Sequence, residues 1–434
     1  MSTTDLFLTW SNLSLEAIEA RLAAGQDQAA VEQLFGAEQA AELQQLAAAP
    51  AAKGLGDRVV LLPGLMGSNL ASVRGLTEHL WLNPLLIAAG RVNDLDLNAD
   101  GSADARPEIE TIPVGLDRLI YTRLALALRK NCSVYEFPYD WRRSITYNAG
   151  LLTAALEKWA QGSSRRQFTL VGHSMGGLVI RACLAANPQL AGKRVKQVIT
   201  HGTPYYGAAG TVENLVLGNR ELKIAALLNA NNRPRQLLFN LPSLYEILPA
   251  PPALFPAGRP YPVNWDIYTA AAWQISDIRQ DYLERARRFY ALILGADPQC
   301  PQTQIAGCNL ETVVEVWRSF NGDKPDYDLV RSDTGRDAGD GTVPHWSAVA
   351  PGFDVYYVQE VHRTLPTNPQ VIQATLALVE GGAVDLPSTL PPRKTGWFSR
   401  DLQPRPQTQA QQLRDHLQTG ALTREDLDAF YFAL

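Results

Sequence analysis

Short apolar runs alternate with longer segments of helical periodicity through the middle of the chain. The runs are β-branched or aromatic and are bounded by turn residues, which is typical of buried strands. They are RVVLLPG (58–64), CSVYEFP (132–138), FTLVGHS (168–174), VKQVITHG (195–202) and FDVYYVQE (353–360). Between them, segments such as GLDRLIYTRLALALRK (115–130) carry apolar residues three and four positions apart, as on one face of a helix. This alternation predicts an α/β fold, with a mostly parallel central sheet and helices on both faces.

The two ends of the chain follow a different pattern. Residues 1 to about 50 are rich in Ala, Gln, Glu and Leu, and LEAIEARLAAGQDQAAVEQLFG (15–36) has helical spacing interrupted by glycine, which predicts a helical appendage. QQLRDHLQTGALTREDLDAFYFAL (411–434) has the same helix, glycine, helix layout. Helical hairpins are common, so the likeness leaves open whether the ends pack together, bind a partner or are unrelated.

One stretch of about 130 residues, between HGTPYYG (201–207) and GDGTVP (339–344), is too long to be a single strand-to-helix connection and predicts an inserted cap. The expected division of the chain then has five parts. They are a helical appendage (1–52), a first core part (53–210) with a lid segment at about 70–112, a cap (211–325), a second core part (326–382), and a Pro-rich linker with a helical tail (383–434).

Composition narrows the class of protein. The chain has 434 residues, of which 46% are apolar and 19% charged, and a formal net charge of −5, which argues against nucleic acid as a partner. MSTTDLFLTW at the start lacks the basic and apolar regions of a secretory signal, and no long apolar run suggests a membrane span. We therefore expect a cytoplasmic protein, with peripheral membrane contact still open. The four cysteines show no CxxC spacing of the kind that binds metals. Neither a metal nor an organic cofactor is expected.

The segment VGHSMGG (171–177) holds the strongest candidate for chemistry. Gly172, Ser174 and Gly176 form a G-x-S-x-G pattern between a predicted strand and a predicted helix. In a nucleophile elbow this turn holds the serine in a strained conformation, and glycines avoid crowding by the neighbouring strand and helix. The alternative is an ordinary sharp corner, but the strand–turn–helix context favours a catalytic serine.

A serine hydroxyl needs a base, and an elbow predicts the order Ser, acid, His along the chain. His362 directly follows the strand FDVYYVQE and is the expected base, whereas His345 in GTVPHWS is expected to line the site. For the acid, Asp340 lies between two glycines on a turn that would present its carboxylate. Asp337 and Asp333 remain the alternatives, in a polar stretch where solvated charges are the usual explanation. The acid would hold the imidazole tautomer and stabilise the imidazolium.

An oxyanion formed at this serine would need two backbone N–H donors. One normally comes from the residue after the nucleophile, which is Met175, and the other from the loop after an early strand. In LLPGLMGSNL (61–70), Leu65 follows Pro63 and Gly64 and is the natural second donor.

Six motifs together resemble the lecithin:cholesterol acyltransferase-like group of α/β hydrolases, which includes phospholipid:diacylglycerol acyltransferases and lysosomal phospholipases. They are VLLPGLMGSNL, EFPYDWRRS, LVGHSMGGLV, HGTPYYGA, GDGTVP and VHRTLPTNP, spread over roughly residues 57–380. The resemblance implies the same triad and oxyanion donors. It also implies that TEHLWLNPLLI belongs to a lid with Trp81 as its membrane- or acyl-facing aromatic. Tyr205 and Tyr206 could line an acyl pocket, although packing in the core is the more common use of such side chains.

Three functional hypotheses follow. The first is a serine-dependent lipid acyl hydrolase or O-acyltransferase that works through an acyl-enzyme, on phospholipids or other acyl lipids. The second is a soluble carboxylesterase for a small non-lipid ester. The third is a catalytically silent scaffold that binds a protein through its terminal helices. The complete Ser, Asp and His set argues against the third.

Overall fold

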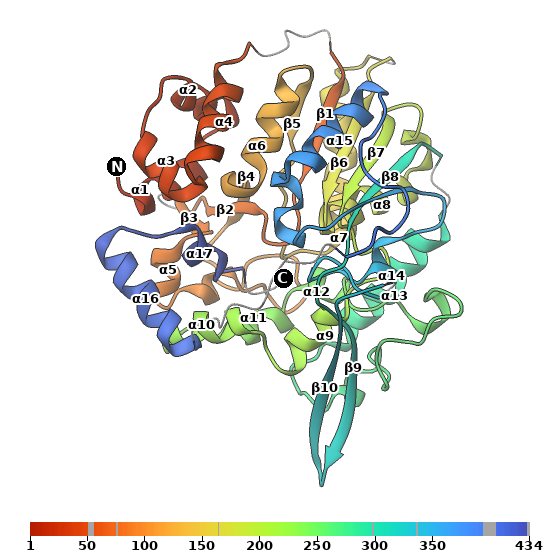
Figure 1. Cartoon of the computed structure of the whole chain (residues 1–434). Coiled ribbons are helices and arrows are strands. Elements are labelled where there is room, and N and C mark those ends of the chain that lie inside the picture. The colour runs from red at the N-terminus through yellow and green to blue at the C-terminus, as the bar shows by residue number, and fades with distance from the viewer. Residues whose placement is uncertain are drawn as a thin grey trace.

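A six-stranded parallel sheet forms the centre of the protein (Figure 1). The computed structural model describes residues 1–50, 56–74, 77–163, 165–296, 299–335, 337–393 and 405–431. The strand order is β11-β8-β7-β6-β1-β5. The strands are β1 (Arg58–Leu62), β5 (Ser133–Glu136), β6 (Phe168–His173), β7 (Val195–His201), β8 (Gln302–Gly307) and β11 (Asp354–Val358). The five strands expected from the sequence are all confirmed, as is the α/β class.

Helices cover both faces of this sheet (Figure 1). On one face α7 (Ile145–Ala160) packs against α8 (Met175–Ala186), which in turn packs against α13 (Gln280–Gly295). On the other face α6 (Arg118–Arg129) packs against α15 (Pro369–Glu380). Their ends carry local signals, since Asp117 caps α6 by accepting the Leu119 N–H at 2.8 Å. Helices with one apolar face thus bury the sheet on both sides.

Strand β8 lies inside the segment that the sequence assigned to the cap (211–325), and that boundary is wrong. The strand was missed because its first residues are polar, yet Gln302, Thr303 and Gln304 are all buried. A hydrogen bond replaces solvation for Gln304, whose amide donates to the Thr203 carbonyl at 3.2 Å. The second part of the core therefore begins near residue 302 rather than 326.

The remaining elements form smaller units around the sheet. Strands β2 (Ser68–Ser72), β3 (Glu78–Trp81) and β4 (Thr111–Leu116) make a three-stranded antiparallel sheet. Strands β9 (Thr312–Asn321) and β10 (Lys324–Ser332) make a hairpin that projects from the body (Figure 1). The short helices are α5 (Pro84–Ala88), α9 (Ala209–Val216), α10 (Arg220–Leu228), α11 (Pro234–Phe239), α12 (Pro242–Tyr245) and α14 (His345–Ala348).

The two ends of the chain pack against each other. The N-terminal helices are α1 (Thr3–Ser11), α2 (Leu15–Ala23), α3 (Gln28–Phe35) and α4 (Ala37–Ala48), and the C-terminal ones are α16 (Pro406–Thr419) and α17 (Arg424–Asp428). Helix α17 contacts α3, and the Thr4 N–H donates to the Gly420 carbonyl at 3.3 Å. Leu6, Ile18 and Leu43 are fully buried and belong to the same hydrophobic cluster as the sheet. The N-terminal helices are therefore part of the core and not an appendage.

Glu246, directly after α12, gives the stability of this core a pH dependence. Its side chain is 1% exposed, and one oxygen accepts the Ile145 N–H at the start of α7 at 2.5 Å. Burial raises the pKa of Glu246 to about 8 from the ordinary 4.5. Because the folded state holds the proton more tightly than the unfolded state, this group lowers stability progressively as pH rises from about 4.5 to about 8.

Replacing Glu246 with Gln is expected to remove that pH dependence while leaving an acceptor for the Ile145 N–H. At pH 8.5 the variant should be more stable than the wild type, by a free energy of unfolding on the order of 3 kcal/mol. At pH 5 the two proteins should differ little. Urea unfolding at both pH values measures this, with the exposed Glu284→Gln as control. An equal gain at both pH values would contradict the assignment.

Candidate active site

Ser174 occupies a strained turn between β6 and α8. Its backbone has φ 53° and ψ −124°, in the left-handed region that costs a non-glycine residue about 1–3 kcal/mol. A Cβ at Gly172 would lie 2.7 Å from the Gly177 nitrogen, and one at Gly176 would lie 2.5 Å from the Pro63 carbonyl oxygen. Gly172 therefore lets the end of β6 approach the start of α8, and Gly176 lets α8 approach the end of β1, which is the close packing a nucleophile elbow requires.

Three side chains that are far apart in the sequence meet at this turn. The Ser174 hydroxyl lies 2.8 Å from His362 Nε2, and His362 Nδ1 lies 2.7 Å from Asp340 Oδ2. His362 and Asp340 are each 1% exposed. The other oxygen of Asp340 accepts the Thr342 and Val343 N–H groups at 3.1 and 2.7 Å. The carboxylate is thus fixed to accept a hydrogen bond from the Nδ1–H of His362, which leaves Nε2 free to accept the serine proton.

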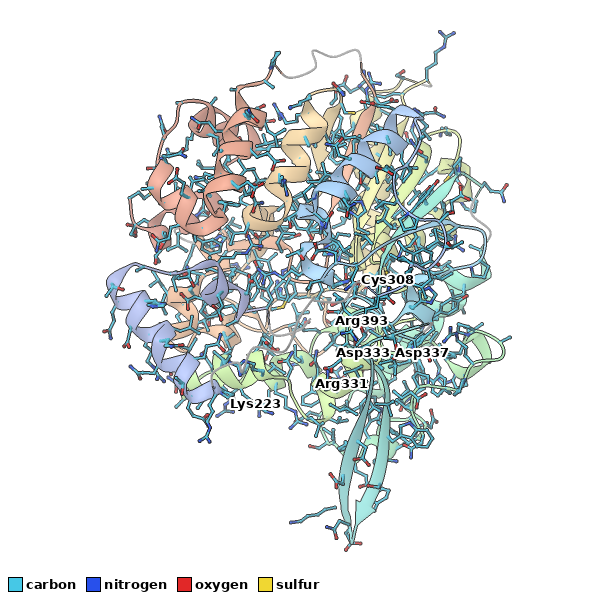
Figure 2. The ribbon with its side chains drawn as sticks, in the orientation of Figure 1. Lys223, Cys308, Arg331, Asp333, Asp337 and Arg393 are labelled. Atoms are coloured by element: carbon cyan, nitrogen blue, oxygen red, sulfur yellow. The ribbon has the colours of Figure 1, made fainter. Side chains whose placement is uncertain are left out.

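The alternative acids lie away from this cluster. Asp337 forms an ion pair with Arg259 at 2.6 Å, and Asp333 forms one with Arg393 at 2.5 Å. Both aspartate side chains are about half exposed, and Figure 2 shows them near the base of the β9–β10 hairpin. Of the three candidates, the structure brings only Asp340 to His362.

A buried network of hydrogen bonds next to the Ser174 turn was not expected from the sequence. His173 Nε2 lies 3.0 Å from the His362 carbonyl oxygen, and its Nδ1 lies 2.8 Å from the Tyr121 hydroxyl. Since a carbonyl only accepts, Nε2 carries the proton, and Nδ1 accepts from the tyrosine. Burial lowers the pKa of His173 well below its ordinary value, which keeps the ring neutral. The only signal in the sequence was a histidine at the second position of G-x-S-x-G.

The same network reaches the loop after β1. The Gly64 N–H donates to the Tyr121 hydroxyl at 2.8 Å, and the Gly67 N–H donates to the Gly64 carbonyl at 3.1 Å. Leu65 and Met66 are therefore the central residues of a β-turn, and Met66 has φ 61° as the third residue of a type II turn does. This turn lies against the nucleophile, because a Cβ on Gly64 would be 3.0 Å from the Ser174 Cβ.

Two backbone donors are available next to Ser174. Met175 is the first residue of α8, so its N–H belongs to the free, positive end of that helix. Within the described ranges, neither the Leu65 N–H nor the Met175 N–H donates to another protein group. Both expected oxyanion donors therefore keep an unused hydrogen atom beside the serine.

A cavity of about 870 Å³ opens at Ser174. Its wall near the serine is apolar and includes Leu65, Pro204, Ala208, Ile247, Val343 and Val361. Elsewhere the wall carries five charged side chains, Glu213, Arg220, Glu221, Lys223 and Arg331, among uncharged residues such as Thr211 and Asn214. Figure 2 shows Lys223 on α10 and Arg331 on β10. Burial raises the pKa of Glu221, and the nearby Glu213 carboxylate raises it further. The cavity therefore has an apolar end and a charged end.

The residues expected to form a lid lie outside this cavity. Trp81 is fully buried, and its Nε1–H donates to the Met66 carbonyl at 2.9 Å. Its ring packs edge-on against Trp141, with 5.5 Å between the centroids. The expectation of a membrane- or acyl-facing Trp81 is therefore wrong, because the indole supports the turn from behind. Among the described residues that line the cavity, none comes from 70–112.

The other aromatic candidates also lie elsewhere. The Tyr205 hydroxyl bonds the Thr200 hydroxyl at 2.9 Å, and Tyr205 and Tyr206 border a separate, smaller depression. The ring of His345 stacks on Tyr357, with 5.5 Å between the centroids. None of the three is among the residues that line the cavity at Ser174. The two tyrosines were expected there because they follow a strand end, and His345 because it is close to Asp340 in sequence, but their side chains make other contacts.

The described part of the chain offers neither a metal site nor a membrane-spanning helix. No group of three or more His, Cys, Asp or Glu side chains there is arranged to hold a metal ion. In the same ranges, every helix is too short or too polar to cross a bilayer.

Comparison with known proteins supplies the family. The family model described as lecithin:cholesterol acyltransferase matches residues 118–375, which is more than half of the chain. The chain belongs to the lecithin:cholesterol acyltransferase family. Together with the strand order and the elbow, this membership makes the architecture an α/β-hydrolase fold, as the sequence predicted. Ser174, Asp340 and His362 all lie within the matched residues.

Individual relatives match over short segments. The chain is 29% identical over 129 residues to phospholipase A(1) LCAT3 of Arabidopsis thaliana, which is 28% of this chain and 29% of that protein. It is 24% identical over 138 residues to lecithin-cholesterol acyltransferase-like 4 of the same plant, 31% of this chain and 26% of that protein. The match thus spans less than a third of either relative.

One solved structure, that of the Tle4-Tli4 complex, matches with a TM-score of 0.50. Its sequence is 15% identical, and the alignment covers 76% of this chain and 99% of that chain. At this identity the match shows a shared fold alone.

Proposed function

We propose that this member of the lecithin:cholesterol acyltransferase family is a serine-dependent lipid acyl hydrolase or O-acyltransferase. The observation that carries the proposal is the continuous hydrogen-bonded series Ser174, His362 and Asp340 at the apolar end of a cavity. A nucleophile, a base and an orienting carboxylate in this order are the parts that acyl transfer requires.

The reaction would proceed in two halves. His362 Nε2 takes the proton from Ser174 as Oγ attacks the ester carbonyl, and Asp340 stabilises the imidazolium. The Leu65 and Met175 N–H groups would hold the negative oxygen of the tetrahedral intermediate. His362 then returns the proton to the departing alcohol, which leaves an acyl group on Ser174. Water or a second alcohol, deprotonated by His362, attacks the acyl-enzyme and restores the serine.

The shape of the cavity favours an amphiphilic substrate. Its apolar end meets Ser174 and suits an acyl chain, whereas the charged end carries cations and carboxylates, with Arg331 paired to Glu213, and suits a polar headgroup. Among the described residues Lys223 has no ion-pair partner, so its ammonium group is available to such a headgroup. A small ester would fill only a fraction of about 870 Å³, which argues against the carboxylesterase hypothesis.

Peripheral contact with a membrane would bring such a substrate to the site. Trp317 and Phe320 on the projecting β9–β10 hairpin are 46% and 51% exposed. The base of the same hairpin supplies Val313 and Arg331 to the cavity wall. Exposed aromatic side chains are well suited to the interface between lipid and water, and here they would place the mouth of the cavity near the bilayer.

Fluorophosphonate labelling measured by intact mass spectrometry tests the proposal. The wild type is expected to gain one adduct, and Ser174→Ala none, because only the triad serine is activated. The same proteins are then incubated with phospholipid vesicles, with and without a long-chain alcohol. Acylated alcohol would establish an acyltransferase, and free fatty acid alone a hydrolase.

Other outcomes would redirect the assignment. Cleavage of a short soluble ester, with no product from vesicles or micellar lipid, would favour the carboxylesterase hypothesis. A folded wild type that gains no adduct would overturn the triad, and the scaffold hypothesis would then take its place.

A further inference from the structure

The residue after the base is held by the far end of the described chain. Arg363 directly follows His362, and its side chain is only 13% exposed. It forms an ion pair with Asp428 at 2.6 Å, and its guanidinium lies 3.6 Å from the centre of the Tyr431 ring. Among the described residues, its Nε and Nη2 have no hydrogen-bond acceptor. Arg363 is therefore held by two side chains from residues 405–431, a segment that we call the clamp, and its charge also interacts with the buried Asp117 carboxylate.

Tyr431 also connects the clamp to the turn from Gly64 to Gly67, which carries Leu65. Its hydroxyl donates to Asp117, whose own N–H donates to the Gly67 carbonyl at 2.9 Å. Its ring meets Trp81 edge-on, with 6.1 Å between the centroids, and Trp81 donates to the Met66 carbonyl. One buried tyrosine, 3% exposed, thus contacts the supports of both the base and the turn that carries Leu65.

The other end of the clamp reaches the cavity. Pro406, the first residue of α16, lines the cavity, and the Gln409 side chain accepts a hydrogen bond from Arg220 in the cavity wall. Helix α16 packs along α10, which carries Arg220 and Lys223. The clamp therefore borders the cavity at one end and the base at the other. It lies outside the residues matched by the family model (118–375).

We propose that the clamp positions the catalytic machinery, with Tyr431 and Arg363 as its positioning residues. This inference rests on the proposed function of Ser174 and His362. A guanidinium with few hydrogen bonds is costly to bury, so without the Tyr431 ring the start of the 3-10 helix His362–Thr367 would shift to hydrate it. Such a shift would lengthen the 2.8 Å contact between His362 Nε2 and Ser174 Oγ, and small displacements of this kind slow catalysis strongly.

Kinetics of full-length variants on a soluble p-nitrophenyl ester test this proposal. Tyr431→Leu removes the ring over Arg363 and is expected to lower kcat about tenfold, with KM changed by less than about twofold. Tyr431→Phe keeps the ring but loses the hydrogen bond to Asp117, so its kcat should fall less than that of Tyr431→Leu. Phe430→Leu is the matched control, because Phe430 is fully buried in the same segment, whereas the ring that stacks on Arg363 belongs to Tyr431.

A second readout does not depend on activity. In protein with isotope-labelled histidine, the imidazole Nδ1–H of His362 gives a resonance that His362→Gln removes. We expect Tyr431→Leu to shift or broaden it, and Phe430→Leu to leave it unchanged. Should Tyr431→Leu fail to fold, Arg363→Lys replaces it, since an ammonium cannot stack in the same way.

Three results would overturn the clamp. They are a Tyr431→Leu enzyme with unchanged kcat and histidine resonance, an equal loss of kcat in Phe430→Leu, and a loss confined to KM. A wild type that neither cleaves the ester nor reacts with a fluorophosphonate would instead reject the proposed function. In that case the His362 Nδ1–H resonance still shows by itself whether Tyr431 positions the segment that carries His362.

Discussion

Replacing Asp340 with Asn is expected to lower kcat for ester cleavage by about 10⁴ while the protein still folds. One oxygen of Asp340 already accepts the Thr342 and Val343 N–H groups, and the other faces His362 Nδ1 at 2.7 Å. In the variant the amide oxygen must keep the two backbone donors, so the NH₂ group turns toward Nδ1. The imidazole would then carry its proton on Nε2 and could not accept one from Ser174.

The control for this variant is Asp337→Asn. Asp337 is 56% exposed and is paired with Arg259, so its loss should change kcat by less than about twofold and stability by less than about 1 kcal/mol. Steady-state kinetics on a soluble ester, with a thermal unfolding curve for each protein, make the comparison. An Asp340→Asn enzyme with a tenth or more of wild-type kcat would show that another group orients His362.

Local patterns predicted most of the fold and the candidate triad. The strands around Ser174 were predictable because they are apolar and end in turn residues, and the elbow combined a strand, a glycine-flanked serine and a helix. Strand β8 was missed because its first residues are polar, although they are buried and Gln304 forms hydrogen bonds within the core. Whether a polar side chain can be buried depends on hydrogen-bond partners that are distant in the sequence, and a local pattern does not show them.

Side-chain direction was the other quantity that the sequence did not reveal. Trp81 and Tyr205 were expected at the site, yet both are buried in other contacts. Conversely, Tyr121 and Tyr431 support the site from positions 53 residues before and 257 residues after Ser174 in the numbering. The pairing of Tyr431 with Arg363 joins two segments that are distant in the sequence and that both pack near α6. It could therefore be found only in three dimensions.

Replacing Leu65 with Pro is expected to lower kcat by about 10²–10³, the usual effect of losing one oxyanion donor. The substitution removes the N–H without breaking the turn, because Leu65 is the second residue of the turn closed by the bond from Gly67 to Gly64, where proline is favoured. Gly64 tolerates the backbone restriction that a following proline imposes, since it has no Cβ.

Leu65→Ala separates the donor from the side chain. Alanine keeps the N–H but loses the Leu65 side chain, which is 4% exposed and lines the cavity, so it should raise KM for long acyl chains and leave kcat within about threefold. Comparing kcat for the two variants on one soluble ester isolates the hydrogen bond, because both lose the same side chain. If proline and alanine lowered kcat equally, the Leu65 N–H would not be an oxyanion donor, and the negative oxygen would be held by Met175 and another group of the turn.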